Sequence, residues 1–158
     1  HCQENIQELV DMIWTNTSIM CWKGKYSPED RIKAFTFVID CYNLLYPDGN
    51  CGFYHERLGD CYKELADNYL KIGDSDQVFL CLERAAEHTI KFDTREDGNY
   101  TSFMVNRIKH SVNDAYKDYT ENDSGLLIKH LNRENYSCFK DDTRMKKIIE
   151  KLKSVAIM

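Results

Sequence analysis

Residues 65–90 of the chain read LADNYLKIGDSDQVFLCLERAAEHTI, two amphipathic segments on either side of a short turn. In both segments apolar or aromatic residues recur every three or four positions, which is the spacing of one buried helix face. Gly73 is expected to end the first helix, because glycine adopts the left-handed conformation of a helix C-terminus at the lowest cost. Asp74, Ser75 and Asp76 carry side-chain oxygens that can cap a second helix. The stretch therefore predicts two antiparallel helices whose shared seam contains Leu65, Tyr69, Leu82 and Ala85.

The helical period continues along the rest of the chain. It predicts helices that begin near residues 3, 28, 53, 75 and 102, a short helix over residues 126–131, and a last helix that contains Met145 and Leu152. The start near residue 28 is the best defined, because Ser27 can cap the helix and Pro28 suits its first position. In the first helix the apolar stripe is expected to contain Ile6, Leu9, Val10, Ile13, Thr17 and Met20.

The small and aromatic residues of the 65–90 hairpin resemble one unit of a tetratricopeptide (TPR) array, an architecture that supports binding far more often than catalysis. The predicted helix pairs repeat at about 45–50 residues, which is longer than the roughly 34 residues of a TPR unit. We expect one all-α domain over residues 1–158, in which antiparallel helix pairs form a TPR-like right-handed α-α superhelix.

The composition argues against several classes of protein. The 158 residues are 42% hydrophobic and carry a net charge of −5, so a folded core is expected and a nucleic-acid surface is not. No apolar run reaches the roughly 20 residues that span a bilayer, and Gln3, Glu4 and Glu8 interrupt any signal-peptide core. We therefore expect no membrane partner. The chain begins at His1 and is expected to be a piece of a longer protein.

The seven cysteines are an odd number. Cys41, Cys61 and Cys81 fall on or beside the apolar stripes of predicted helices, where free thiols behave as small hydrophobic side chains. This favours a reduced, cytoplasmic protein over a disulfide scaffold. Four Asn-X-Ser/Thr triplets point instead to a secreted chain, although such triplets also arise by chance in asparagine-rich sequences. They begin at Asn16, Asn99, Asn122 and Asn135.

Catalytic and metal-binding motifs are sparse. The sequence has no glycine-rich phosphate loop, no His-Glu-X-X-His and no Gly-X-Ser-X-Gly. Cys51 and His55 have the spacing of half a zinc site, but no second Cys/His pair lies at ligand spacing. Cys61 and His88 can be drawn as a nucleophile and base, yet no third group is evident to orient them. We expect no enzymatic activity, no metal and no cofactor.

Short motifs between about residues 28 and 153 carry a more specific resemblance. They are Tyr46-Pro47-Asp48-Gly49, Leu65-Ala66-X-X-Tyr69-X-X-X-Gly73-Asp74, Leu82-Glu83-X-Ala85-Ala86, Phe92-Asp93-Thr94, Tyr100-Thr101-Ser102 and Asp141-Asp142-X-Arg144-X-X-X-Ile148. In these motifs the chain resembles the effector regions of Xre-type helix-turn-helix transcriptional regulators of bacteria, especially anaerobic Firmicutes. The resemblance implies a TPR-like domain that senses a signal and dimerises. The DNA-binding domain of that family is absent from the chain and is expected upstream of His1.

A ligand groove is expected between the helices that begin near residues 53 and 102. The first helix of each pair lines the concave surface of a TPR array, and polar side chains on these two helices face it. Lys63, Asn106 and Arg107 can hold the amide groups or terminal carboxylate of a peptide through charge-assisted hydrogen bonds. The alternative is that these charges form an ordinary solvated face. The candidate ligand residues are Tyr62, Lys63, Asp67, Tyr100, Asn106 and Arg107.

The leading functional prediction is the signal-sensing and dimerisation domain of a helix-turn-helix regulator. Its partners are expected to be a peptide or small-molecule effector and a second copy of the chain, with DNA contacted only through the missing N-terminal domain. A TPR-type protein–protein interaction adaptor without a DNA link is the second hypothesis. An enzyme or metal protein that uses the cysteines is the third.

Overall fold

The computed structural model describes residues 2–96, 98–100, 102, 104, 109–110 and 120–157. The described part is all-α, as predicted, with six α-helices and one 3-10 helix. The α-helices are α1 (Cys2–Lys23), α2 (Pro28–Leu45), α3 (Tyr54–Ile72), α4 (Ser75–Asp93), α5 (Asp123–Leu131) and α6 (Thr143–Lys153), and the 3-10 helix is η2 (Glu134–Phe139). None of these helices is long and apolar enough to cross a membrane.

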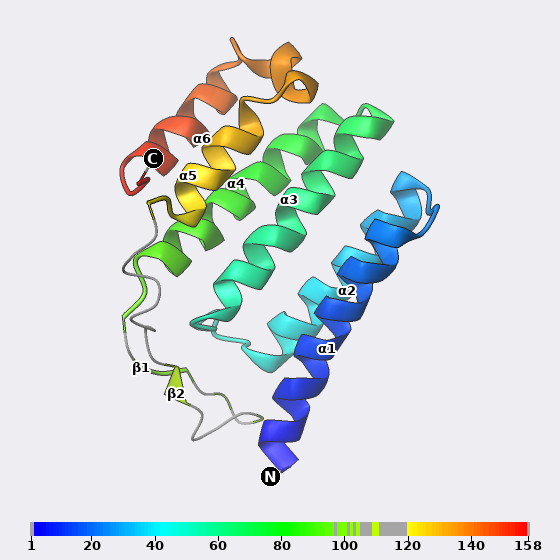
Figure 1. Cartoon of the computed structure of the whole chain (residues 1–158), viewed down its shortest axis with the longest axis vertical. Coiled ribbons are helices and arrows are strands. Elements are labelled where there is room, and N and C mark those ends of the chain that lie inside the picture. The colour runs from blue at the N-terminus through cyan, green and yellow to red at the C-terminus, as the bar shows by residue number, and fades with distance from the viewer. Residues whose placement is uncertain are drawn as a thin grey trace.

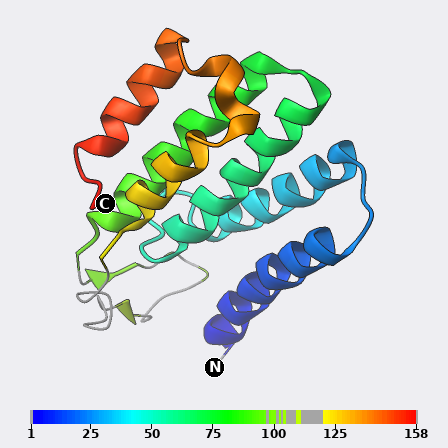
Figure 2. The ribbon, with the colours of Figure 1, turned by 45° about the horizontal axis from the view of Figure 1, so that its top comes forward.

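Consecutive helices run in opposite directions and lie in chain order across the molecule, from α1 at one edge to α5 and α6 at the other (Figure 1, Figure 2). The α3–α4 pair has the most extensive contact, followed by α2 with α3. Helices α5 and α6 both pack on α4 and on each other, whereas α1 packs mainly on α2.

The predicted helix ends are confirmed where local capping determines them. The Ser27 hydroxyl accepts a hydrogen bond of 3.2 Å from the Asp30 amide at the start of α2. Gly73 follows the end of α3 with a φ of 79°, which a residue with a Cβ would adopt only under strain. The Asp74 carboxylate then accepts a hydrogen bond of 3.1 Å from the Gln77 amide and caps α4.

The predicted seam between α3 and α4 lies in the core. Leu65, Leu82 and Ala85 are buried, and Tyr69 is half-buried against the same core. The two helices approach closely at Gly59, where an added Cβ would lie 3.1 Å from the Thr89 hydroxyl oxygen. This close approach is what the small residues of the seam permit.

The prediction of a helix from residue 102 is wrong at Lys109 and His110. Lys109 and His110 form strand β2 (Lys109–His110), which pairs antiparallel with β1 (Gly98–Asn99), so the backbone at these two residues is extended. Pairing with a segment earlier in the chain holds the backbone extended here, and this tertiary contact overrides the helical period. Most of the remaining residues of that predicted helix lie outside the described residues.

The predicted stripe of α1 is also wrong in part. Val10 is buried, but Leu9 and Met20 are 58% and 42% exposed, and the buried residue near the end of the helix is Cys21. The reason is that α1 has a single extensive neighbour, so the array covers only part of its apolar surface.

Candidate functional site

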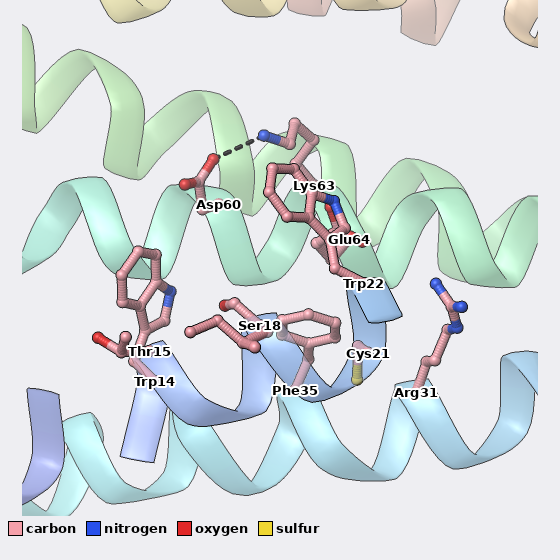
Figure 3. Close-up of a pocket in the computed structure, with 11 residues that line it drawn as sticks. Trp14, Thr15, Ser18, Cys21, Trp22, Arg31, Phe35, Asp60, Lys63 and Glu64 are labelled. Carbon is pink, nitrogen blue, oxygen red and sulfur yellow. Dashed lines mark hydrogen bonds and ion pairs between the residues drawn. The ribbon is translucent and has the colours of Figure 1, made fainter. Parts of the chain in front are cut away.

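Two cavities flank α3, one toward α1 and one toward α5. The first, which we call the Trp cavity, has a volume of about 300 Å³ and lies between α1 and α3 over α2. Figure 3 shows Trp14 at one end, Trp22 at the other and Phe35 of α2 between them. Its α3 wall is charged and consists of Asp60, Lys63 and Glu64.

Helices α1 and α3 are in contact at the Trp14 end of the Trp cavity. The Arg57 guanidinium of α3 lies 3.9 Å from the centroid of the Trp14 ring, a cation–π arrangement. Arg57 also forms ion pairs with Asp11 of α1 (3.3 Å) and with Glu56 (2.7 Å). These contacts fix the spacing of α1 and α3 at this end.

The Trp22 end is open. Trp22 lies in the last turn of α1 and is 85% exposed, although it lines the cavity. Tryptophan is highly buried on average in folded proteins, and exposed tryptophans concentrate at binding surfaces. The exposure of Trp22 therefore makes this surface a candidate binding site.

The charged wall of the Trp cavity contains one unpaired carboxylate. The Lys63 ammonium lies 2.6 Å from Asp60 and is engaged there. Within the described residues the Glu64 carboxylate forms no hydrogen bond or ion pair. Burial and the nearby Asp67 raise the pKa of Glu64 above its usual value, so the site favours a cation beside it.

The second cavity, which we call the Asp123 cavity, lies between α3 and α5 and also has a volume of about 300 Å³. Asp60 and Lys63 line both cavities, so the two sites share one wall of α3. Burial, together with Asp93, Glu56 and Asp60, raises the pKa of Asp123 to about 6. Burial also raises the pKa of Glu56, even though Arg57 opposes the shift.

The structure places two of the predicted ligand residues on this side of α3. Lys63 lines both cavities, as a groove residue should. The carboxylate of Asp67 instead receives hydrogen bonds from His130 Nε2 at 2.9 Å and from the Tyr136 hydroxyl at 2.7 Å. Asp67 therefore attaches the C-terminal helices to α3.

Tyr62 and Tyr100, the other predicted ligand residues that the structure describes, do not line either cavity with Lys63. The Tyr62 ring stacks on His88 of α4, with centroids 5.5 Å apart. Tyr100 donates a hydrogen bond to the Glu96 carbonyl and lines a different cavity that also contains His55. Asn106 and Arg107 lie outside the described residues.

The sequence prediction missed the tryptophans of α1. Both tryptophans of the chain, Trp14 and Trp22, line the Trp cavity, yet neither belongs to the apolar stripe predicted for this helix. Two large aromatic residues outside a predicted core stripe indicate a candidate binding surface, since an amphipathic helix seldom exposes such side chains without a partner.

The structure brings His88 to the pair formed by Cys51 and His55. The Cys51 sulfur lies 3.3 Å from His55 Nδ1, which lies 2.8 Å from His88 Nδ1. Burial lowers the pKa of both histidines to about 4 and raises that of Cys51 to about 12, so all three are neutral at pH 7. Among the residues that the structure describes, no group of three or more His, Cys, Asp or Glu side chains is arranged to hold a metal ion.

Comparisons of the chain with protein-family models, with curated proteins and with solved structures find no match.

Proposed function

We propose that this chain is a TPR-like binding module that holds an extended peptide along the face formed by α1, α3 and α5. The exposed Trp22 at the mouth of the Trp cavity is the observation that carries the proposal. An exposed aromatic side chain beside an apolar cavity is the usual anchor of a peptide site. The shared Asp60–Lys63 wall supports one elongated ligand rather than two separate ones.

Binding rather than catalysis is favoured by the state of the candidate nucleophiles. Burial raises the pKa of the Cys61 thiol, and the pKa of about 4 at His88 makes it a weak base. Neither residue lines the Trp cavity or the Asp123 cavity.

The more specific form of the proposal is the cytoplasmic signal-sensing and dimerisation domain of an Xre-type regulator, with the peptide or a small molecule as effector. It is supported by the sequence motifs between about residues 28 and 153. The alternative is an adaptor without a DNA link. The coding sequence upstream of His1 separates the two: a helix-turn-helix segment there favours the regulator.

A selection from a displayed library of random linear peptides tests the binding role. Enriched peptides are expected to shift the backbone amide NMR signals of residues that line the two cavities, including Trp14, Lys63 and Asp123. Trp22→Ala is expected to weaken binding, whereas Leu44→Ala, which removes a 72% exposed side chain from α2, is not. Failure to enrich any peptide, or shifts confined to residues away from the cavities such as Phe37 and Leu80, contradicts the proposed function.

A further inference from the structure

The Trp cavity has mainly apolar walls on α1 and α2, which suit an apolar group. Its α1 and α2 walls carry the two tryptophan rings, Ile19 and Phe35. Its one cation from α2, Arg31, donates to the backbone carbonyls of Gly24 and Tyr26 at 3.4 Å and so holds the α1–α2 loop. An apolar cavity of about 150 Å³ already binds benzene, so this larger space admits one aromatic or branched aliphatic side chain.

The wall of α3 and the start of α5 carry two carboxylates, Glu64 and Asp123, that form no ion pair within the described residues, although Lys63 and Lys71 lie near Glu64 and Arg95 lies near Asp123. Lys63 is held by Asp60, and Arg57 is held by Asp11 and Glu56. Within the described part of the chain, the side chains of Glu64 and Asp123 form no hydrogen bond or ion pair. Arg133 also lines the Asp123 cavity, but it is exposed and follows the C-terminus of α5, roughly 15 Å along the helix from Asp123.

The same charges argue against a ligand that is held by its carboxylate. Lys63 is the only cationic side chain that lines both cavities in the described part of the chain, and its ammonium is 2.6 Å from Asp60. A ligand carboxylate would have to displace Asp60 and would lie beside Glu64. A ligand cation meets two carboxylates that form no ion pair with a described residue.

We infer that the ligand is a basic peptide that inserts one large apolar side chain between Trp14 and Trp22 and places a lysine or arginine against Glu64 and another against Asp123. The inference rests on the proposed function and specifies its ligand class. Asp60 and Lys63 line both cavities, so an extended chain that crosses this wall of α3, at roughly 3.3 Å per residue, passes from one cavity to the other within a few residues. A peptide with its second cation about three positions after the apolar residue has this spacing.

The chain contains its own reporter for this ligand. Its two tryptophans both line the Trp cavity, so tryptophan emission responds when the cavity is filled. The probe is the blocked peptide acetyl-Gly-Lys-Phe-Gly-Gly-Lys-Gly-amide, titrated into the intact chain. One matched peptide has glutamate in place of both lysines, and another has alanine in place of phenylalanine.

We expect a saturable emission change with the basic phenylalanine peptide and affinities at least about tenfold weaker for both matched peptides. Added salt should lower the affinity for the basic peptide, because salt screens exposed charge pairs. Equal affinity for the glutamate peptide, or no loss on replacing phenylalanine with alanine, overturns the inference.

Variants localise the effect. Trp22→Ala, in which Trp14 remains as the reporter, should abolish saturable binding without lowering the melting temperature. Glu64→Gln and Asp123→Asn should each weaken the binding of the basic peptide. The affinity for the glutamate peptide should stay the same or rise. Glu83→Gln removes the same charge from an exposed position of α4 and should change the affinity for neither peptide. An unchanged affinity in Glu64→Gln and Asp123→Asn overturns the assignment of the cations.

The outcomes separate this inference from the proposed function. Selected peptides that bind the two cavities but are acidic or lack a large apolar residue overturn the inference and leave the binding role standing. Absence of any bound peptide removes the binding role itself. A concentration-dependent emission change of the chain alone, together with dimer formation in sedimentation, would assign the cavity to a second copy and overturn the inference.

Discussion

The hydroxyl of Tyr136 donates a hydrogen bond of 2.7 Å to the carboxylate of Asp67, 69 residues away in the sequence. Tyr136 is buried in η2, and Asp67 lies in α3. His130 Nε2 contacts the same carboxylate oxygen at 2.9 Å, so one acid holds both α5 and η2 against α3. This is how the C-terminal helices complete the Asp123 cavity, to which His130 also contributes.

Replacing Tyr136 with phenylalanine should lower the free energy of unfolding at pH 7 by about 1.5–3 kcal/mol, since a hydrogen bond to a buried carboxylate is lost. Burial alone would raise the pKa of Asp67, but the hydrogen bonds from His130 and Tyr136 outweigh it and lower the pKa below 3.8. A lowered carboxyl pKa gives stability that is present above the unfolded value and lost as the pH falls through the folded value.

The difference between wild type and Tyr136→Phe should therefore shrink in urea titrations below about pH 4. Tyr26→Phe, which changes a 43% exposed ring, serves as the control and should have little effect. A pH-independent loss in Tyr136→Phe would mean that packing, rather than the hydrogen bond, accounts for its effect.

Leu82→Ala should destabilise the fold by roughly 2–5 kcal/mol, because it leaves a cavity in the α3–α4 seam. The Leu82 side chain is fully buried, whereas Leu80 on the same helix is 51% exposed. Leu80→Ala is therefore the matched control, with an expected change within about 0.5 kcal/mol. Similar losses for the two variants in chemical denaturation would contradict the packing described here.

Asp123→Asn should stabilise the chain by about 1 kcal/mol above pH 6, a modest gain because solvent screens part of the charge of this partly exposed group. The raised pKa of Asp123, about 6 against an ordinary value of 3.8, means that the folded state resists its ionisation. The destabilisation by wild-type Asp123 is absent below the unfolded pKa, grows as the pH rises toward 6 and is complete above it. Thermal melts at about pH 4 and pH 7 measure the difference.

The control for this variant is Asp76→Asn, which removes a 94% exposed carboxylate from the first turn of α4. It should change stability by less than about 0.5 kcal/mol. Destabilisation by Asp123→Asn at neutral pH would show that the helix N-terminus gains more from the negative charge than burial costs.

Thiol titration should find all seven cysteines free when the denatured chain is prepared under reducing conditions. In the native protein Cys2 and Cys138 should react first, because both are exposed. Burial raises the pKa of Cys51 to about 12 and that of Cys81 to about 11, so these thiols should react only after unfolding. One tightly held zinc ion per chain would reverse the expectation for Cys51 and His55.

Residues 1–158 alone should bind duplex DNA weakly or not at all. Their net charge of −5 opposes the release of counterions that gives DNA-binding proteins most of their affinity. Fluorescence anisotropy with a labelled duplex at two salt concentrations measures this. Submicromolar, salt-sensitive binding would show that this chain itself carries a DNA-reading surface.

The sequence predicted the first four helices closely because local chemistry sets their ends. Ser27 and Pro28 start α2, and Gly73 with Asp74 separates α3 from α4, and each of these devices acts within a few residues. The seam of α3 and α4 was also predictable, since the helix that follows a short turn is the natural partner. The helical period alone could not reveal that Lys109 and His110 pair with Gly98 and Asn99.

The candidate site was decided by tertiary structure. A helical period shows which residues share a face, but it cannot show how much of that face the neighbouring helices cover. On α1 that coverage leaves Trp22 exposed at the mouth of a cavity. Likewise, the sequence identified Asp67 as a polar residue of α3. Only the packing of α5 and η2 on the rest of the fold brings His130 and Tyr136 within hydrogen-bond distance of its carboxylate. Contacts between residues this far apart depend on the placement of whole helices, which local sequence does not encode.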